Sequence, residues 1–171
     1  MVMHEKGVVT SLDPNVRPNL IPDRASYISR LERIISCADI LKLSDEDLLW
    51  LYPNYTKEDA FDHVCSLSGD GVKVMTKGAD GAFAKSNSAE QRISSIPLEV
   101  LADTVGAGDT FMATMLIWLR DNNVLTREDI HQLNKNQLSA LLQKASLAAG
   151  LNCMKYGCNP PTSDEIMLHN Q

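Results

Sequence analysis

The segment with the clearest chemical potential is Asp103-Thr104-Val105-Gly106-Ala107-Gly108-Asp109. Small residues lead directly into a predicted helix, so several N–H groups of its first turn lack partners and form a positive dipole end. Gly106 and Gly108 let an anion approach the backbone without meeting a β-carbon. Asp109 would lie beside that anion, where a carboxylate can take a proton from a hydroxyl that attacks a phosphoryl group. In a plainer interpretation, Asp109 only complements the helix dipole and the glycines only pack.

The elements that must position this segment follow from the apolar pattern. Short apolar runs alternate with helical patterns, which is typical of βαβ units and a parallel sheet. Strands are expected over Val8–Leu12, Ile40–Leu43, Val72–Thr76, Ala82–Lys85 and Gln91–Pro97. Helices are expected after the caps Asp23, Ser44 and Thr56, and over Ala107–Arg120, Lys135–Leu151 and Ser163–Leu168. We therefore expect one α/β unit over residues 1–171, with its N-terminal sheet edge exposed.

Composition narrows the class of protein. The 171 residues are 44% hydrophobic and 22% charged, which is the size and balance of one globular domain. A net charge of −6 argues against a nucleic-acid or anionic-membrane surface, and no apolar run reaches the roughly 20 residues of a membrane span. The four cysteines form no CxxC pair, so we expect structural thiols in a reducing cytoplasm. The four histidines, which lack ligand spacing, are expected at the solvated surface: His4, His63, His131 and His169.

Two further polar segments follow predicted strands, at the edge where open α/β sheets bind ligands. In the segment 13–17, Asn15 and Arg17 could reach a sugar or a phosphate, and the guanidinium suits phosphate oxygens. The same segment could instead be a structural turn that Pro14 fixes. In the segment 76–81, two glycines give backbone room for a nucleotide, although a plain turn between strands also explains them.

An acid-rich turn, Ser44-Asp45-Glu46-Asp47, opens the helix that follows the second strand. Carboxylates in such a turn could hold a hydrated Mg²⁺ through water. They could also simply favour a helix N-terminus.

The pattern Asp-Thr-x-Gly-Ala-Gly-Asp at 103–109 closely resembles the C-terminal signature of the ribokinase-like (PfkB-type) carbohydrate kinases. Other segments follow in that family's order, at 13–18, 42–47, 76–81 and 157–161. The likeness covers residues 8 to 166, and its Asp-Pro-Asn-x-Arg and Asn-Pro-Pro versions look most like bacterial fructokinases. The resemblance implies a ribokinase-like three-layer αβα fold with a mainly parallel sheet.

The resemblance also implies roles for individual residues. Asp109 matches the catalytic base that deprotonates the sugar hydroxyl attacking the γ-phosphorus of ATP. Gly106, Ala107 and Gly108 match the anion hole, whose amides meet the charge on the transferred phosphoryl group. The Asp103 side chain and the Val105 carbonyl match positions that bind a monovalent cation such as K⁺ in some members.

The resemblance places nucleotide and metal contacts in the remaining segments. Ser44 and Asp47 stand where the family usually carries Asn-x-x-Glu, and Asp47 and Glu46 are the expected ligands of Mg²⁺ through water. The residues expected to bind ATP are Ser44, Thr76, Lys77, Gly78, Gly81, Asn152, Gly157 and Cys158, and those expected at the substrate or phosphate are Asn15 and Arg17.

The chain departs from the family in length. The family's N-terminal portion carries most sugar contacts and a small β-sheet lid, and the sequence shows neither. The implied reaction is ATP-dependent phosphorylation of a sugar hydroxyl by a full-length parent, fructokinase-like, with little activity in the isolated chain. A 2-keto-3-deoxygluconate kinase, a nucleoside kinase or a non-catalytic nucleotide-binding fragment are the alternatives. The exposed sheet edge predicts self-association, with a homodimer as its simplest form.

Overall fold

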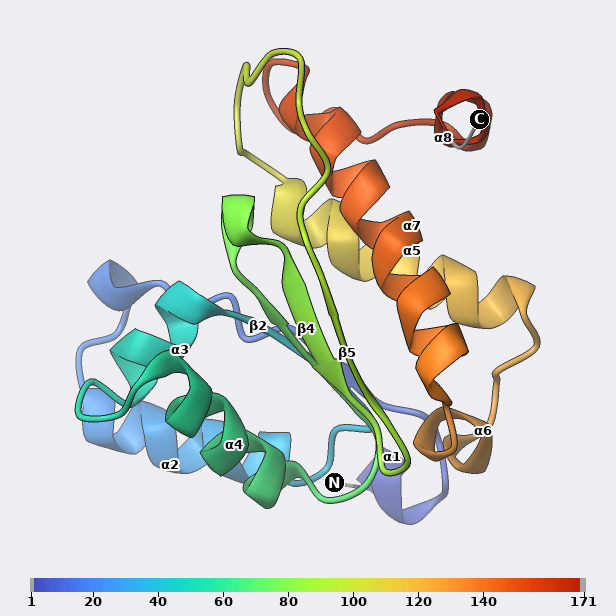
Figure 1. Ribbon diagram of the computed structural model, residues 1–171. Coiled ribbons are helices and arrows are strands. Elements are labelled where there is room, and N and C mark those ends of the chain that lie inside the picture. Colours follow the sequence, from blue (N-terminus) through green and yellow to red (C-terminus); the bar gives the residue numbers. More distant parts are fainter. Residues whose placement is uncertain (1, 170–171) are drawn as a thin grey trace.

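The computed structural model describes residues 2–169 and contains one five-stranded sheet (Figure 1). The strands lie in sequence order, and they are β1 (Ser11–Leu12), β2 (Ile40–Ser44), β3 (Val72–Thr76), β4 (Ala82–Lys85) and β5 (Glu90–Ile93). The first three are parallel, and β4 is antiparallel to both of its neighbours. Only β4 therefore runs against the common direction, which confirms the mainly parallel sheet.

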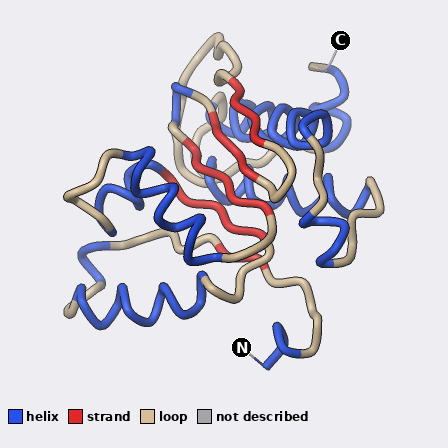
Figure 2. Tube along the Cα trace, turned by 60° about the horizontal axis from the view of Figure 1, so that its bottom comes forward, coloured by secondary structure: helices blue, strands red, loops and turns tan. Residues whose placement is uncertain are grey.

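Helices cover both faces of this sheet (Figure 2). One face carries α2 (Arg24–Ile35), α3 (Asp45–Leu51) and α4 (Lys57–Ser68). The other carries α5 (Ala107–Asp121), α6 (Arg127–His131) and α7 (Lys135–Cys153). The remaining elements are short, and they are α1 (Val2–Glu5), α8 (Ser163–Leu168) and the 3₁₀ turns Pro18–Leu20 and Gly78–Asp80.

Alternation along the strands divides the core between the two faces. In β2, Leu41 and Leu43 pack toward α2, α3 and α4, whereas Ile40 packs toward α5 and α7. Because side chains alternate along a strand, Lys42 points to the same face as Ile40. A buried lysine thus lies in the layer that contains α5.

The predicted helix starts are confirmed by their caps. Asp23 accepts hydrogen bonds from the amides of Ala25 and Ser26, and Ser44 and Thr56 each accept one from the amide three residues ahead. Each cap satisfies amides that a helix start would leave unpaired.

Two predicted strands are shorter than expected. The first begins at Ser11 rather than Val8, because the amide and hydroxyl of Thr10 bind the Asp39 carboxylate instead. The last covers Glu90–Ile93 rather than Gln91–Pro97. It ends there because Ile93 pairs with Ala82, the first residue of β4, and no residue of β4 remains to pair further.

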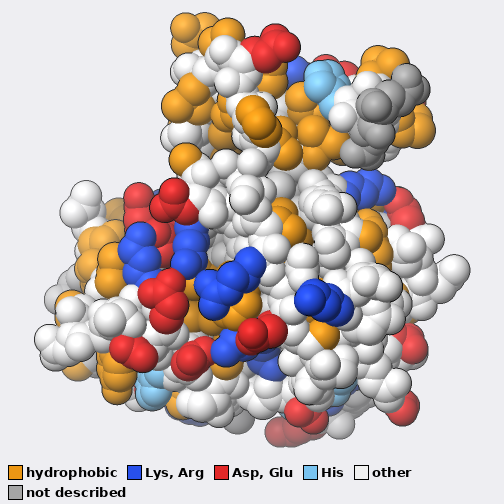
Figure 3. All heavy atoms as spheres, in the orientation of Figure 1, with side chains coloured by type: hydrophobic (Ala, Val, Ile, Leu, Met, Phe, Trp, Pro, Cys, Tyr) orange, Lys and Arg blue, Asp and Glu red, His pale blue; other side chains and the backbone are white. Residues whose placement is uncertain are grey.

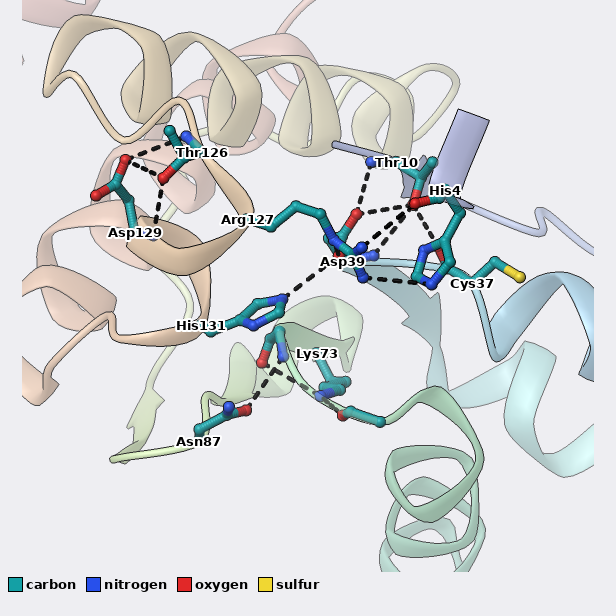
Figure 4. Close-up of polar contacts among 12 residues, drawn as sticks. His4, Thr10, Cys37, Asp39, Lys73, Asn87, Thr126, Arg127, Asp129 and His131 are labelled. Atoms are coloured by element: carbon teal, nitrogen blue, oxygen red, sulfur yellow. Dashed lines mark hydrogen bonds and ion pairs between the residues drawn. The ribbon is translucent and has the colours of Figure 1, made fainter. Parts of the chain in front are cut away.

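The amino end of the sheet holds a polar cluster that the sequence did not predict (Figure 4). Asp39, 1% exposed, accepts hydrogen bonds from the Thr10 amide at 2.9 Å and from Arg127 Nε at 2.6 Å. His131 Nε2 lies 3.4 Å from the same carboxylate, and His4 Nε2 lies 3.3 Å from the Arg127 guanidinium. The expectation of solvated surface positions is therefore wrong for His4 and His131.

The surface carries charges of both signs. On the face shown in Figure 3, acidic and basic side chains lie intermixed, and apolar side chains gather over the upper part, where segment 94–106 and α8 lie. Along the described residues, no helix combines the length and the apolar character that crossing a membrane requires. All four cysteines are free thiols.

Candidate functional site

The first turn of α5 presents free backbone amides at the carboxyl end of the sheet. Gly106 is its N-cap in the left-handed conformation, with φ of 77°, and the Ala107 amide donates to Thr104 at 3.2 Å. Within residues 2–169, the amides of Gly108 and Asp109 have no hydrogen-bond partner. The exposed Asp109 carboxylate likewise has no hydrogen bond or ion pair there. An anion can therefore meet two free amides beside an uncommitted carboxylate.

The loop before α5 is held by Asp103. One oxygen of its carboxylate accepts from the Val105 amide and the other from the Gly157 amide, both at 3.0 Å. These backbone hydrogen bonds, with that of Val105 the strongest, lower the pKa of Asp103. The carboxylate thus ties segment 103–106 to the loop at 157–160. Its predicted contact with a monovalent cation, shared with the Val105 carbonyl, stays a prediction.

Asn152 joins the same two loops from α7. Its side chain is fully buried, and Nδ2 donates to the Val105 carbonyl at 2.8 Å while Oδ1 accepts from the Asn159 amide at 2.9 Å. No surface of Asn152 is left for the adenine contact that the sequence predicted. The structure makes it a residue that positions the two loops.

Cys158 packs directly on the start of α5. A β-carbon added at Gly106 would lie 2.3 Å from Cys158 Sγ, and the backbone there is left-handed. Gly106 is therefore required twice, for its conformation and for this close approach. Cys158 is exposed next to Gly106, and the predicted nucleotide contact of Gly157 and Cys158 stays a prediction.

Lys42 and Asp13 form a buried ion pair below the same turn. Lys42 Nζ lies 2.9 Å from Asp13 Oδ2, and the two side chains are 4% and 16% exposed. Burial raises the pKa of Asp13, Lys42 opposes this, and the carboxylates of Asp47 and Asp109 add to the rise. Sequence reasoning missed Lys42 as a site residue. The available signal was its place in an apolar strand, on the face that alternation turns toward α5.

In the acidic turn, the Asp47 carboxylate binds backbone amides of the fold. Asp47 Oδ1 accepts from the Val16 amide at 2.9 Å and Oδ2 from the Ser44 amide at 3.0 Å, so both oxygens are committed to the fold. Ser44 Oγ in turn accepts from the Asp47 amide. The shorter side chain of Asp47 thus closes a capping box, and its predicted contact with Mg²⁺ through water stays a prediction. Glu46 is exposed but stands alone, and the described residues contain no group of three metal-ligating side chains.

Asn15 and Arg17 line a shallow cavity of about 270 Å³ next to this turn. Asn15 has a positive φ of 44°, and Arg17 Nη1 donates to the Val16 carbonyl at 3.3 Å. Asp47 holds the intervening residue, so α3 fixes the segment. Both side chains face open space at the carboxyl end, where a substrate or phosphate contact stays a prediction.

The loop after β3 is explained in part as a turn. Thr76 Oγ1 donates to the Leu43 carbonyl, and Lys77 Nζ pairs with Glu58 at 2.8 Å. Gly78 and Gly81 have φ of 52° and 88°, and a β-carbon at Gly81 would lie 2.1 Å from the Ile93 carbonyl oxygen. These contacts account for the glycines by the turn alone, and nucleotide binding by this loop stays a prediction.

Open α/β sheets bind ligands at the carboxyl ends of their strands, and free amides at a helix start are suited to a phosphate group. The family model of the pfkB family carbohydrate kinases matches residues 2–165, and the chain belongs to this family. A fructokinase from Rhizobium leguminosarum bv. trifolii is 40% identical over 132 residues, covering 76% of this chain and 39% of its own.

Solved structures confirm the ribokinase-like fold. Aminoimidazole riboside kinase from Salmonella enterica, complexed with aminoimidazole riboside and an ATP analog, aligns with a TM-score of 0.81 at 22% identity, over 99% of this chain and 54% of that one. A fructokinase double mutant from Vibrio cholerae O395, bound to fructose, ADP and a potassium ion, aligns with a TM-score of 0.79 at 23% identity, over 97% and 51%. The chain thus spans about half the length of these neighbours.

Proposed function

We propose that the protein transfers the γ-phosphoryl group of ATP to a hydroxyl of a small sugar. One observation carries this proposal: the uncommitted Asp109 carboxylate lies in the same helical turn as the free amides of Gly108 and Asp109. A phosphoryl acceptor needs a base for its proton, and the phosphoryl group needs donors for its charge. The first turn of α5 supplies both.

The proposed reaction uses these groups in one step. Asp109 accepts the proton of the sugar hydroxyl as its oxygen bonds to the γ-phosphorus, and the bond from that phosphorus to the bridging oxygen breaks to release ADP. The amides of the turn stabilise the charge on the transferred group. Magnesium would be carried by the phosphates and water rather than by the acidic turn. Fructose is the favoured acceptor, since the Rhizobium relative is called a fructokinase.

The second part of the proposal concerns the chain taken alone. Because it spans 39% of the Rhizobium fructokinase, we propose that the residues choosing and enclosing the sugar lie largely outside it. Positioning contributes most of the rate of phosphoryl transfer, so the 171-residue chain should bind ATP but turn over slowly. The alternative, a nucleotide-binding protein without catalysis, is favoured by the same short coverage.

The test separates binding from chemistry. Calorimetry should show that the chain binds a non-hydrolysable ATP analogue. The Asp109→Asn variant should bind it with an affinity within about threefold of that of the unaltered chain, since the variant keeps the backbone amides. An assay of ADP release with fructose, ribose and 2-keto-3-deoxygluconate should show slow turnover that Asp109→Asn lowers by about 10²- to 10⁴-fold. Turnover unaffected by Asp109→Asn would exclude Asp109 as the base. Turnover at the usual rate of a kinase would contradict the second part.

A further inference from the structure

Lys42 is a buried cation that the proposed reaction does not yet use. It lies in the middle of β2, is 3% exposed, and has one carboxylate partner, Asp13 Oδ2 at 2.9 Å. A buried ion pair is weak evidence for stability, because an apolar pair of similar volume is often as stable. The position of the ammonium offers a better reason for its presence.

Gly108 shows where that ammonium is directed. A β-carbon at Gly108 would lie 3.4 Å from Lys42 Nζ, so only the missing side chain separates the ammonium from the first turn of α5. The φ of Gly108 is not positive, hence its backbone does not require glycine. Within a helix glycine is less stable than alanine by about 0.5–1 kcal/mol. A glycine with ordinary backbone angles at this place keeps space open between Lys42 and the free amides.

The charged groups around this space leave Lys42 able to bind an anion. Lys42 has three N–H donors and uses one on Asp13. The other acidic groups close to Asp13 are Asp47, which is committed to backbone amides, and Asp109, which has no partner among residues 2–169. Two donors of Lys42 thus remain, and its ammonium lies next to the Gly108 position in the first turn of α5.

We propose that Lys42 binds the terminal phosphate of a nucleoside triphosphate across the gap left by Gly108, and that Asp13 is the positioning residue that holds its ammonium there. This inference rests on the proposed function and adds selectivity to it. A diphosphate ends one phosphate short of the ammonium, so the triphosphate binds more tightly than the diphosphate. Asp13 contacts no phosphate and acts only through Lys42.

The experiment compares the affinities for ADP and for a non-hydrolysable ATP analogue, measured by calorimetry on the 171-residue chain and its variants. Lys42→Met should lower the affinity for the triphosphate by about 10- to 100-fold, which corresponds to the loss of a hydrogen bond to a charged group. It should lower the affinity for the diphosphate by less than about threefold. Asp13→Asn should reduce the selectivity partly. The double variant should match Lys42→Met alone, because Asp13 acts through Lys42.

Two further variants keep the test independent of folding. Gly108→Ala introduces one methyl group beside Lys42 Nζ and should lose triphosphate selectivity without losing stability. Lys73→Met is the matched control. Lys73 is also a buried strand lysine, 5% exposed, but it donates to the Gly69 and Gly71 carbonyls at the amino end of β3. This variant should keep full selectivity.

The outcomes separate the two proposals. Equal loss of ADP and ATP-analogue affinity in Lys42→Met, or unchanged selectivity in Gly108→Ala, overturns the role of Lys42 while nucleotide binding stands. A chain that binds neither nucleotide overturns the proposed function, and the role of Lys42 falls with it. Loss of selectivity in Lys73→Met would assign the effect to general destabilisation.

Discussion

Asp13, which is half-buried, and Asp39, which is buried, lie at opposite ends of the same sheet, and their surroundings shift their pKa values in opposite directions. Burial by itself raises the pKa of Asp39, but hydrogen bonds from the Thr10 amide, Arg127, the Thr10 hydroxyl and His131 outweigh it, and the pKa is lowered (Figure 4). Burial also raises the pKa of Asp13, where Lys42 only partly offsets it. The donors around the Asp39 carboxylate therefore outweigh its burial, whereas those around the Asp13 carboxylate do not.

The difference separates a structural cluster from a binding site. At the amino end, Asp39 joins residues far apart in the chain, such as Arg127, 88 positions later. At the carboxyl end, free amides, an uncommitted Asp109 and a lysine beside a glycine gap surround open space. Gly108 and Asp109 are exposed, so their unpaired amides can bind an anion in place of water. We infer that the cluster at the amino end holds the layers together and that the groups at the carboxyl end bind a phosphate.

The largest expected effect is the loss of the amino-end cluster. Asp39→Ala leaves Arg127 and Thr10 without their shared acceptor, and should lower the free energy of unfolding by about 3 kcal/mol. Urea unfolding followed by circular dichroism measures it. Asp13→Asn, the matched change at the other end, should cost less than about 1 kcal/mol, since amide and carboxylate are similar in shape and the ion pair contributes little. Equal losses would remove the contrast between the two ends.

Gly106→Ala should have the next largest effect, and at the carboxyl end. The left-handed φ costs a non-glycine residue about 1–2 kcal/mol, and the new β-carbon would meet Cys158 Sγ at 2.3 Å. Affinity for the ATP analogue should fall with stability as the start of α5 shifts. The double variant Gly106→Ala with Cys158→Gly keeps the strain and the contact with the backbone of residue 158 but removes the side-chain contact, so it should recover part of the affinity. No recovery would show that Cys158 does not constrain the turn.

Acid unfolding should distinguish the two aspartates by sign. The pKa of Asp39 is lowered in the folded state. Its contribution to the free energy of unfolding is therefore present above the unfolded-state pKa of about 3.9 and is lost as the pH falls through the folded-state pKa. Asp39→Asn should therefore flatten the loss of stability below about pH 4. The pKa of Asp13 is raised in the folded state, so its contribution to the free energy of unfolding is present below the unfolded-state pKa and is lost as the pH rises. Asp13→Asn should therefore steepen the loss of stability in acid. Urea unfolding between pH 2 and 7, on the order of ten points, measures both.

The smallest expected effect has opposite signs in stability and binding. Gly108→Ala should raise the free energy of unfolding by about 0.5 kcal/mol, because alanine is the better helix former. The variant should lower the affinity for the ATP analogue, because its new methyl group lies beside Lys42. Stability and affinity that fall together would mean that the glycine serves packing rather than the gap.

Local signals predicted much of this fold. Asp23, Ser44 and Thr56 cap helices as their side chains and positions indicate, because capping depends on residues within one turn. Short apolar runs likewise predicted the strands β2, β3 and β4 close to their observed bounds. The short helix α6 was missed, since five residues carry too little periodicity to be recognised.

The site was harder to predict, because its partners meet only in three dimensions. The sequence placed Asp109 and the glycines correctly at a helix start, but Asp47 turned toward Val16 and Asn152 toward Val105, choices made by distant backbone groups. Lys42 carries no local sign of its partner Asp13. Sequence patterns thus predicted the location of the candidate phosphate site. They did not predict which of its side chains would remain without partners.

The central claim is that the carboxyl end of the sheet binds nucleotide phosphates while the amino end does not. The most direct measurement is a titration of the isotope-labelled chain with a non-hydrolysable ATP analogue and Mg²⁺, followed by amide NMR shifts. The account predicts the largest shifts at Gly106, Gly108 and Asp109, with Thr10 and Asp39 unchanged. Shifts concentrated at Thr10 and Asp39, or none at the start of α5, would contradict it.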